Sequence, residues 1–569
     1  MKETGLIWRF QRGCTVSSSS CSPWLVRLFS WRSLSIVLLI LLALLIALPL
    51  VNLLLMSIQG VDGGFSLQGF RTFFSESEYL EGLFNSVLLG ALVTLTASIL
   101  GVSLAYITQV YEFPCKRLLS LLPISIIVIP EIISVQSWLL VFGNNGVLTR
   151  ALSDLGLELP SFYGWFGMVY VMTFTYYAYV YMATLSALKG FDRQLLEAAT
   201  NLGLSEFQAR LKVLVPLLSP AIISGALVVF TLVLGNFAIA MTLGHGIPLL
   251  SILTYKTFLS EIGLNPAMQS TLATVSTLLL VSVMLVQRWI LGRGRYEMAQ
   301  GRPLLAKRLT GLSAWLHTLP VLLVVAGSLL PLALLLVGAF TRARGPVMQW
   351  GEWTLDNFER VWAYGMGTIL NSLGFAALAT LIGVILGTLV AYATVKKRGG
   401  LSPVLEFIAM LPLAVSGTVL GIALAQGVSS FAVGLAGSSM LMVLAYSVRR
   451  LPFSVRNAAN NLHNVDDSLE AASVSLGVSP CKTFFKVSLP LMSAGIAAAG
   501  VLMWATTVAE LNSSIVVYSA GQETLPIQIF RLIDSDMMAM ASAYGVIMIS
   551  LILLPVIVAT RVFNLKLFA

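Results

Sequence analysis

The sequence predicts an all-α membrane protein with twelve transmembrane helices in two homologous six-helix halves. Three observations predict this fold class: the composition, the lengths of the apolar runs and an internal repeat. Of the 569 residues, 57% are hydrophobic and only 10% are charged, whereas soluble domains carry roughly 25% charged residues. Because so few polar residues cannot cover so much apolar surface, a bilayer must surround the chain, and a soluble globular protein is excluded.

Twelve apolar runs approach the length of about 20 residues that a helix needs to cross the hydrocarbon core. The first run is interpreted as a retained anchor and not as a signal peptide, because no small-residue cleavage site follows it. The predicted spans are 34–58, 83–110, 118–142, 163–188, 217–243, 270–291, 316–341, 369–394, 403–426, 431–448, 491–518 and 539–563.

The basic residues predict the orientation of these helices. With the N-terminus inside, the inner segments hold 27 of the 34 Lys and Arg residues and the outer segments hold 7. Lys and Arg concentrate in the cytoplasmic loops of membrane proteins, so both termini are expected in the cytoplasm. The net charge of +9 is spread over short segments between apolar runs, which favours membrane lipid, and not nucleic acid, as the partner of this charge.

An internal repeat relates the two sets of six runs. Asn85 begins a block that matches the block at Asn371, and Gly203 lies in a block that matches the one at Gly477. Two halves with an even number of spans have parallel topology, which predicts a two-fold axis along the membrane normal. A duplicated, purely structural bundle is the alternative. The predicted domains are a cytoplasmic segment 1–33, a first half 34–291, a cytoplasmic linker 292–315 and a second half 316–569.

The inner loop 191–216 has the sequence of two short helices joined by a bend. Asp192 is a favourable cap for the first helix, and Gly203 suits the left-handed residue that follows a helix. Ser205 and Gln208 have the spacing of a capping box that starts the second helix. We therefore expect a rigid helix–bend–helix element in this loop.

The loop 465–490 repeats this pattern. Asp466 opens its first helix and Gly477 closes it. Ser479 is expected to cap the second helix, and Pro480 stands at the first helical position, where proline is tolerated. The alternative for both loops is that their helices lie on the lipid surface.

The first loop resembles the EAA loop of permease subunits of bacterial ABC importers. The second loop departs from this motif, because Ala471 holds the glutamate position and Glu470 comes one residue early. Two such loops in one chain resemble the fused permeases of the ferric-iron transport family and its relatives. The resemblance implies that a set of residues in the two loops couples the chain to an ATPase. They are Asp192, Glu197, Ala198, Ala199, Gly203, Pro216, Asp466, Glu470, Ala471, Ala472, Gly477 and Pro490.

The resemblance implies the type I ABC importer permease fold and two kinds of partner. Two copies of a cytoplasmic ABC ATPase subunit would each seat one loop, and a periplasmic solute-binding protein would deliver the substrate. The chain contains no GxxxxGK[ST] motif for nucleotide phosphates. No inner segment exceeds about 40 residues, which is too short for an ATPase domain. The chain is therefore expected to be no enzyme and to hold no cofactor, with ATP and Mg bound by the partner ATPase.

Polar residues inside predicted spans suggest a translocation pathway, because ionisable groups in a membrane are costly. Glu510 occupies the position in the repeat that Asn236 holds in the first half, and Asn512 could share its polar face. A hydrogen bond that fixes helix packing is the alternative role for Glu510. Glu131 follows Pro130, and a structural or interfacial role is the preferred interpretation for it.

The residue types suggest no catalytic or metal site. The three histidines are scattered, and the four cysteines lack CxxC spacing. The tyrosines between Tyr163 and Tyr181 are interpreted as packing residues and an interfacial belt. Acidic outer residues, Asp534 and Asp536 among them, either dock a basic binding protein or are ordinary solvated charges.

The expected function is that of an ABC importer permease in the bacterial inner membrane. Ferric iron is the first choice of substrate on the resemblance. A phosphonate or phosphorylated small solute is the second, and thiamine or a polyamine follows. Two other classes remain open, an ion-driven secondary transporter and a membrane anchor for a sensor complex.

Overall fold

The computed structural model describes residues 31–60, 64–260, 266–293, 307–309, 311–431 and 433–562. The predicted N-terminal segment 1–33 lies outside these residues except for its last three positions. Most of the predicted linker 292–315 also lies outside them. The described residues are mostly helical, with two small sheets of two strands each.

The first half of the chain forms long apolar helices separated by short ones. The long helices have exposed leucines on their outer faces, as helices that contact lipid do. In chain order the elements are α2 (Trp31–Leu42), η2 (Ala43–Ala47), α3 (Leu48–Ser57), α4 (Gln68–Ser75), α5 (Ser77–Val110), β1 (Tyr111–Glu112), α6 (Lys116–Ser125), η3 (Ile126–Val128), α7 (Glu131–Phe142), α8 (Val147–Asp154), α9 (Trp165–Lys189), α10 (Arg193–Asn201), α11 (Glu206–Ala209), η4 (Arg210–Leu214), α12 (Val215–Leu234), α13 (Ala238–Leu243), α14 (Leu250–Ser260) and α15 (Pro266–Arg293).

The second half has a similar succession and adds a hairpin. Strands β3 and β4 pair antiparallel, whereas β1 of the first half pairs in parallel with β2, which lies in the linker before the second half. The elements are β2 (Lys307–Arg308), α16 (Leu312–Ala339), β3 (Thr341–Arg344), β4 (Val347–Trp353), α17 (Asp356–Tyr364), α18 (Met366–Val395), α19 (Ser402–Met410), η5 (Leu411–Ala414), α20 (Gly417–Phe431), η6 (Val433–Leu435), α21 (Ser439–His463), α22 (Asp467–Ser475), α23 (Pro480–Thr483), η7 (Phe484–Ser488), α24 (Leu489–Val508), α25 (Ser514–Val517), α26 (Leu525–Asp534) and α27 (Met538–Val562).

Eight described helices are long and apolar enough to cross a membrane, or up to ten spans if each of two bent helix pairs counts as one. The bends are 111° within 116–154 and 117° within 402–428. The spans predicted at 118–142 and 403–426 fall on these bent helix pairs, since the chain is extended at Pro130 and at Val415. The span predicted at 431–448 is also displaced, because α21 covers Ser439–His463.

Equivalent elements recur at one constant interval in the sequence, the interval that separates Gly203 from Gly477. Helices α22, α23 and α24 begin and end at the positions that correspond, by this interval, to the ends of α10, α11 and α12. Even the π-helical turn η4 has its counterpart η7 at the same interval. The repeated sequence thus produces the same local structure twice.

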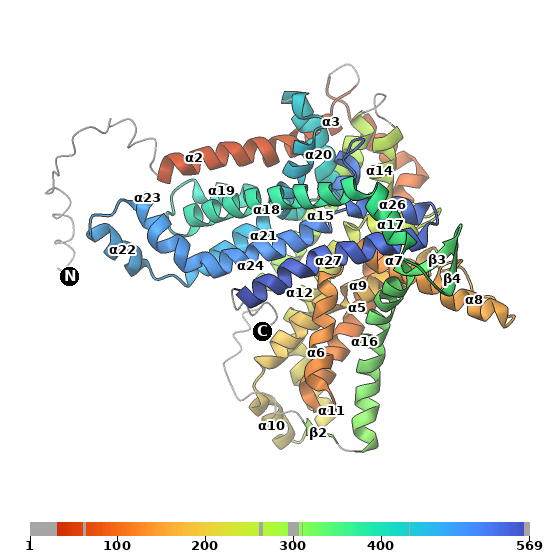
Figure 1. The fold of residues 1–569 in the computed structure, drawn as a ribbon. Coiled ribbons are helices and arrows are strands. Elements are labelled where there is room, and N and C mark those ends of the chain that lie inside the picture. Colours follow the sequence, from red (N-terminus) through yellow and green to blue (C-terminus); the bar gives the residue numbers. More distant parts are fainter. Residues whose placement is uncertain are drawn as a thin grey trace.

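The long helices form two arms that diverge from a common end (Figure 1). The first arm contains α5, α6, α9, α12 and α16, and the second contains α2, α18, α19, α21 and α24. Helices α10 and α11 lie at the free end of the first arm, and α22 and α23 at the free end of the second. We call the common end, where α7 meets α13, α26 and α27, the junction.

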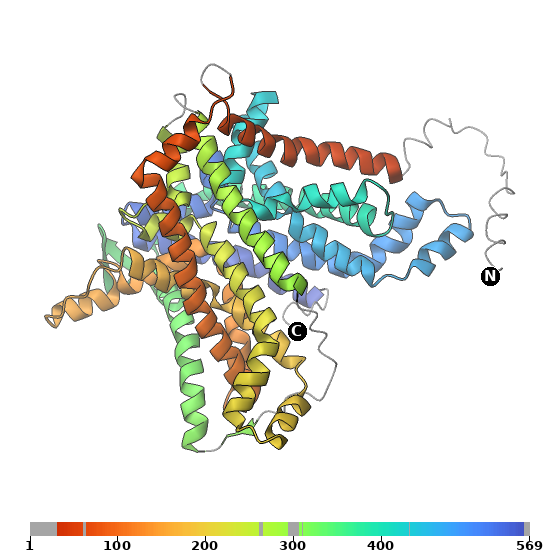
Figure 2. The same ribbon diagram turned by 180° about the vertical axis from the view of Figure 1, so that it is seen from behind.

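Each arm contains one helix that comes from the other half of the chain. Helix α2 packs on α18 and α19 of the second half, and α16 packs on α6 and α7 of the first. The ring of Trp31 lies 4.4 Å from that of Tyr392, centroid to centroid. Figure 2 shows α2, which continues into α3, running along the second arm and away from α5, the next long helix in the sequence.

Repeated glycines allow the central helices of each arm to approach. A Cβ on Gly101 of α5 would lie 2.7 Å from the carbonyl oxygen of Tyr177 on α9. A Cβ on Gly387 of α18 would lie 2.3 Å from Oγ of Ser454 on α21. Small residues at such crossings are typical of packed membrane helices, and they explain why this glycine recurs in both halves.

Candidate functional site

The loop at the free end of the first arm has the predicted helix–bend–helix structure. The carboxylate of Asp192 accepts a hydrogen bond from the backbone N–H of Gln194 at 3.0 Å. Gly203 has a φ of +91° and ends α10. The side chains of Ser205 and Gln208 form the predicted capping box. The backbone of this loop is therefore held by local hydrogen bonds at both helix starts.

The second loop repeats this geometry with one exception. Asp466 accepts a hydrogen bond from the N–H of Ser468 at 2.9 Å, and hydrogen bonds from Ser468 lower the pKa of Asp466. Gly477 has a φ of +82°. Ser479, in contrast, makes no side-chain hydrogen bond to the helix that follows, so its predicted capping role is wrong. Pro480 at the first position already fixes φ there.

The small and apolar residues of these loops form exposed tips. Leu202 is 86% exposed and Leu476 is 84% exposed. They occupy equivalent positions in the repeat, and each precedes its bend glycine. Ala198, Ala471 and Ala472 are also exposed, whereas Ala199 is buried, and Pro216 and Pro490 lie in the first turns of α12 and α24. An exposed apolar tip on a rigid loop suits a protein groove, because contact with the groove removes apolar surface from water.

The glutamates of the two loops point to different surroundings. Glu197 is 53% exposed at its side chain and pairs only with Arg193 of its own helix, at 2.6 Å. Glu470 is buried and accepts hydrogen bonds from Tyr392, Lys397 and Ser488. The one-residue shift of the glutamate thus turns it from the exposed face of the loop helix toward α18 and η7.

A second group of polar residues lies deep in the junction, and we call it the polar layer. Its members come from α7, α9, α21 and the segments that follow α12 and α24. They are Glu131, Tyr176, Asn236, Arg449, Arg450, Glu510 and Asn512.

The first half contributes a chain of hydrogen bonds to the polar layer. The amide of Asn236 donates to the hydroxyl of Tyr176 at 2.8 Å, and that hydroxyl donates to Oε1 of Glu131 at 2.6 Å. Oδ1 of Asn236 accepts from the backbone N–H of Ile239 at 2.9 Å. Tyr176 was predicted to serve in packing or at the interface, but it is buried and links two polar side chains.

The second half places charged residues at the equivalent positions. Arg450, which corresponds to Tyr176 in the repeat, forms an ion pair with Glu510, which corresponds to Asn236. Oε1 of Glu510 accepts from the N–H of Ser513, as Asn236 does from Ile239. The neutral pair of one half is therefore an ion pair in the other, which satisfies two charges that would be costly alone.

Arg449 and Arg450 were counted with an inner loop in the sequence prediction, and this is wrong. Both lie in the interior of α21. The guanidinium of Arg449 donates to the carbonyl oxygens of Pro412 and Val415, at 3.0 Å and 2.5 Å. Those carbonyls are freed by the bend between α19 and α20. For these two residues the sequence held one signal, a pair of arginines beside an apolar run.

The two halves meet within the polar layer. The side chain of Asn512 lies near the carboxylate of Glu131 of the first half. A Cβ on Gly417 would lie 2.6 Å from Cβ of Asn512, so glycine makes room for this contact. Thus Glu131, Asn236, Glu510 and Asn512, which come from three segments far apart in the sequence, are brought together in the junction.

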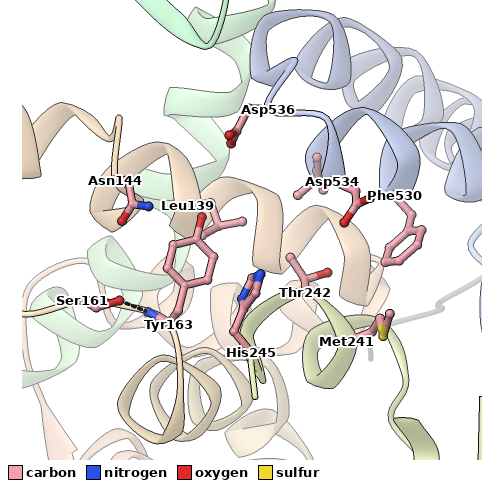
Figure 3. Close-up of a pocket in the computed structure, with 11 residues that line it drawn as sticks. Leu139, Asn144, Ser161, Tyr163, Met241, Thr242, His245, Phe530, Asp534 and Asp536 are labelled. Carbon is pink, nitrogen blue, oxygen red and sulfur yellow. Dashed lines mark hydrogen bonds between the residues drawn. The ribbon is translucent and has the colours of Figure 1, made fainter. Parts of the chain in front are cut away.

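A cavity of about 380 Å³ opens at the junction between residues of both halves (Figure 3). The ring of His245 packs edge-on against that of Tyr163, with centroids 4.9 Å apart. Asp534 and Asp536 face them from the second half. No three His, Cys, Asp or Glu side chains of the described residues are grouped to hold a metal ion.

Comparison with known proteins shows a similarity to a family of transport proteins. Residues 97–295 match the family of the binding-protein-dependent transport system inner membrane component. A probable ABC transporter permease protein of Sinorhizobium fredii is 25% identical over 84% of this chain and 87% of its own length. Over these residues the chain is similar to the permeases of this family, and we refer to it below as the permease. The permease is a multi-pass membrane protein.

Other relatives of the permease carry more specific names. A ferric transport system permease protein of Actinobacillus pleuropneumoniae is 24% identical over 82% of this chain and 68% of its own length. A putative 2-aminoethylphosphonate transport system permease protein of Salmonella paratyphi A is 25% identical over 40% of this chain and 85% of its own length.

Proposed function

We propose that the permease forms the translocation pathway of an ATP-binding-cassette importer whose solute is ferric iron delivered by a periplasmic binding protein. The observation that carries the proposal is the pair of rigid, exposed loops at the free ends of the two arms. Relatives named as ferric transport permeases, each aligned over at least 80% of this chain, support the choice of solute.

The proposal includes twelve spanning helices in two six-helix halves. Helices α9 and α21 have 25 residues each, which is about 37 Å of helix and enough to cross the hydrocarbon core. Helix α9 packs on α5 and α12, and α21 packs on α18 and α24. The eight candidate spans, the two bent pairs and these two helices make twelve. The excess of basic residues on one side supports cytoplasmic termini in a bacterial inner membrane.

The two loops are the proposed docking sites for two copies of a cytoplasmic ABC ATPase. ATP and Mg would bind to that partner, so the permease itself would be no enzyme and hold no cofactor. When two docked ATPases close, they pull the loops together. Because each loop is rigid and continuous with α12 or α24, the movement reaches the junction. The arms then alternate between opening to the outside and opening to the cytoplasm.

The proposed pathway passes through the polar layer, where Asn236, Glu510 and Asn512 lie between the arms. The cavity beside Tyr163 and His245 would lie above it on the outer side. A phosphonate is the second candidate solute, on the names of relatives that match 40% of the chain. The alternative function is that of an ion-driven secondary transporter, which would need no ATPase. This alternative is excluded if uptake requires an ATPase.

The proposal is tested by co-expression of the permease with the ATPase and the binding protein that are encoded beside it. The ATPase should co-purify with the permease, and liposomes with both should take up ferric ion only with ATP and loaded binding protein. Glu197→Lys should abolish stimulated ATP hydrolysis while the protein stays inserted, because it places a cation on the docking face. Glu158→Lys, at an exposed position outside both loops, is the control. Uptake without ATP, or normal stimulation of Glu197→Lys, contradicts the docking assignment.

A further inference from the structure

Two short helices, α4 and α17, occupy equivalent places in the two halves. Each is separated by a single residue from the central helix that follows it, α5 or α18. Helix α4 also packs on α15 and α17 on α27, the last long helix of its own half. At its other end α5 leads into β1, which pairs with β2 at the free end of the first arm (Figure 1). Helix α4 therefore lies at the end opposite the loops, and α17 lies close to the junction.

The segments that lead into these helices have the same hydrogen bonds. The backbone N–H of Ser66 donates to the carbonyl oxygen of Ile58 at 2.9 Å, and that of Thr354 donates to the carbonyl oxygen of Phe340 at 2.8 Å. Ile58 directly follows α3, and Phe340 directly follows α16. The side-chain oxygens of Ser66 and Thr354 each accept a hydrogen bond from the N–H two residues on, at 3.2 Å and 3.1 Å. Each short helix is thus tied to the end of the first spanning helix of its half.

Three apolar side chains at each of these places are exposed, and they correspond to one another at the interval that separates Ser66 from Thr354. Their exposed fractions lie between 46% and 77%. We call each set of three an apolar edge. The sets are Phe65, Leu67 and Phe74 in the first half, and Trp353, Leu355 and Trp362 in the second. Exposed apolar patches mark contacts with a partner or with a membrane.

Each short helix has three faces, of which the apolar edge is one. Phe73 is buried among residues of α14 and α15, and the equivalent Val361 is also buried. Gln68 and Asp356, at equivalent positions, are exposed and polar. With 3.6 residues per turn, the apolar edge falls between the buried face and the polar face. This order of faces suits a helix at the boundary between membrane and water, where one side meets protein, one lipid and one water.

The apolar edges continue into surface that contacts lipid. The next exposed apolar residues along the chain are Leu80 and Phe84 near the start of α5, and Leu370 near the start of α18. Aromatic side chains are enriched where spanning helices leave the hydrocarbon core. A soluble binding protein is the alternative partner. A single binding protein has no reason to contact the same residue types in both halves, whereas the bilayer surrounds both halves alike.

We propose that α4 and α17 are interfacial helices, whose apolar edges bind the headgroup region of the phospholipid bilayer at the junction end of the permease. Because each is tied to the first spanning helix of its half and leads directly into α5 or α18, it fixes the depth of these helices in the bilayer. The starts of the central helices are then held at the membrane boundary while the free ends of the arms move. The contact is apolar, so neutral phospholipid is sufficient, and it does not depend on the solute.

The test measures which surroundings the apolar edges meet in vesicles of phosphatidylcholine. In a permease whose four cysteines are replaced by serine, a nitroxide spin label is attached to Phe74→Cys or Trp362→Cys. The matched controls are Gln68→Cys and Asp356→Cys, on the polar faces of the same two helices. All four positions are exposed, so the variants should fold. The ratio of collisions with oxygen, which concentrates in the bilayer, to collisions with a water-soluble nickel chelate should be at least about threefold higher at the apolar edges.

Two results would overturn the inference. Equal ratios at the apolar edges and the polar faces would show that the edges meet water. Shielding of the edges that arises only when the binding protein is added would make them its docking site. The native permease is measured for uptake in the same vesicles, and a failure of the proposed function there leaves the outcome for the two helices unchanged.

Discussion

A single-residue shift separates the two loop glutamates in both structure and expected role. Glu197 lies on the exposed face of α10, where a partner can reach it. Glu470 lies on the buried face of α22 and is tied to α18 through Tyr392 and Lys397. Burial raises its pKa, but hydrogen bonds from Ser488 and Lys397 and the charge of Lys397 outweigh this and hold the pKa of Glu470 below its usual value. Glu470 therefore fastens the second loop to its own arm.

Replacement of Glu470 should lower stability in a pH-dependent way. A carboxylate with a pKa below its unfolded value stabilises the fold above about pH 4.5, and this contribution disappears as the pH falls through the folded-state pKa. Glu470→Gln should therefore cost about 1–3 kcal/mol at neutral pH, and the difference should shrink on acidification. Thermal unfolding in detergent between about pH 7 and about pH 4 measures this.

The control for this experiment is Glu197→Gln, which changes an exposed carboxylate on the equivalent loop. Exposed ion pairs contribute little to stability, so its unfolding midpoint should match that of the native permease at every pH. A Glu470→Gln protein as stable as native at neutral pH would contradict the proposed fastening role.

Sequence predicted some of these residues better than others. The one-residue shift of Glu470 could be recognised in the sequence, because the two loops could be aligned with each other. The partly buried position of Arg449 and Arg450 was not, since it depends on Glu510, which lies on a later segment of the chain, and on carbonyls freed by a bend. A basic pair beside an apolar run has the same sequence whether it ends a helix or is neutralised inside one.

At the scale of elements, the loop tips are the parts most clearly shaped for contact. Leu202 and Leu476 are held out by glycines in left-handed conformation. Replacing either glycine with an L-residue would strain the bend, so the tip leucine and its glycine form one unit. Both tips are the same distance in sequence from the helix that continues into the arm.

Leu202→Asp and Leu476→Asp should each weaken ATPase binding without unfolding the permease. The leucines are exposed, so substitution should change stability by less than about 0.5 kcal/mol. A charge in an apolar groove should reduce co-purified ATPase severalfold, and the double variant more. Leu155→Asp, at a residue 76% exposed after α8, serves as the control. Unchanged ATPase binding in the double variant would contradict docking at these tips.

Helix ends at these loops were predicted well because caps are local. The side-chain oxygens of Asp192, Asp466 and Ser205 bond to backbone groups two or three residues away. The bends at Pro130 and Val415 were harder to predict from the sequence. Apolar runs on both sides predict one long helix, and only packing against α9 and α21 shows that the chain turns.

At the scale of the whole molecule, the two halves are interlocked by exchanged helices. Helix α2 covers the second arm and α16 covers the first. Strand β1 of the first half also pairs with β2, which lies in the linker before the second half. Association of membrane helices rests on close packing over large surfaces, and here that packing does not depend on a continuous chain.

The permease should therefore still assemble when its two halves are expressed as separate chains. Residues 1–300 and 301–569 expressed as separate chains should co-purify in detergent, with transport activity close to that of the intact chain. Removal of residues 1–60 from the first chain should reduce the yield of the complex, because it deletes α2 and α3 and their contacts with α18, α19 and α20. Separate migration of the two complete chains would contradict the interlocked arrangement.

The sequence by itself determined that the chain is a membrane protein, that its two halves repeat, and that two capped loops stand at equivalent places. Hydropathy, periodicity and helix caps act over a few residues, so they can be read along the chain. Only the tertiary structure decided which helices belong to which arm, where the chain bends, and that Glu131 and Asn512 meet. These features depend on contacts between segments far apart in the sequence. The local sequence of an apolar helix does not reveal which other helices pack against it.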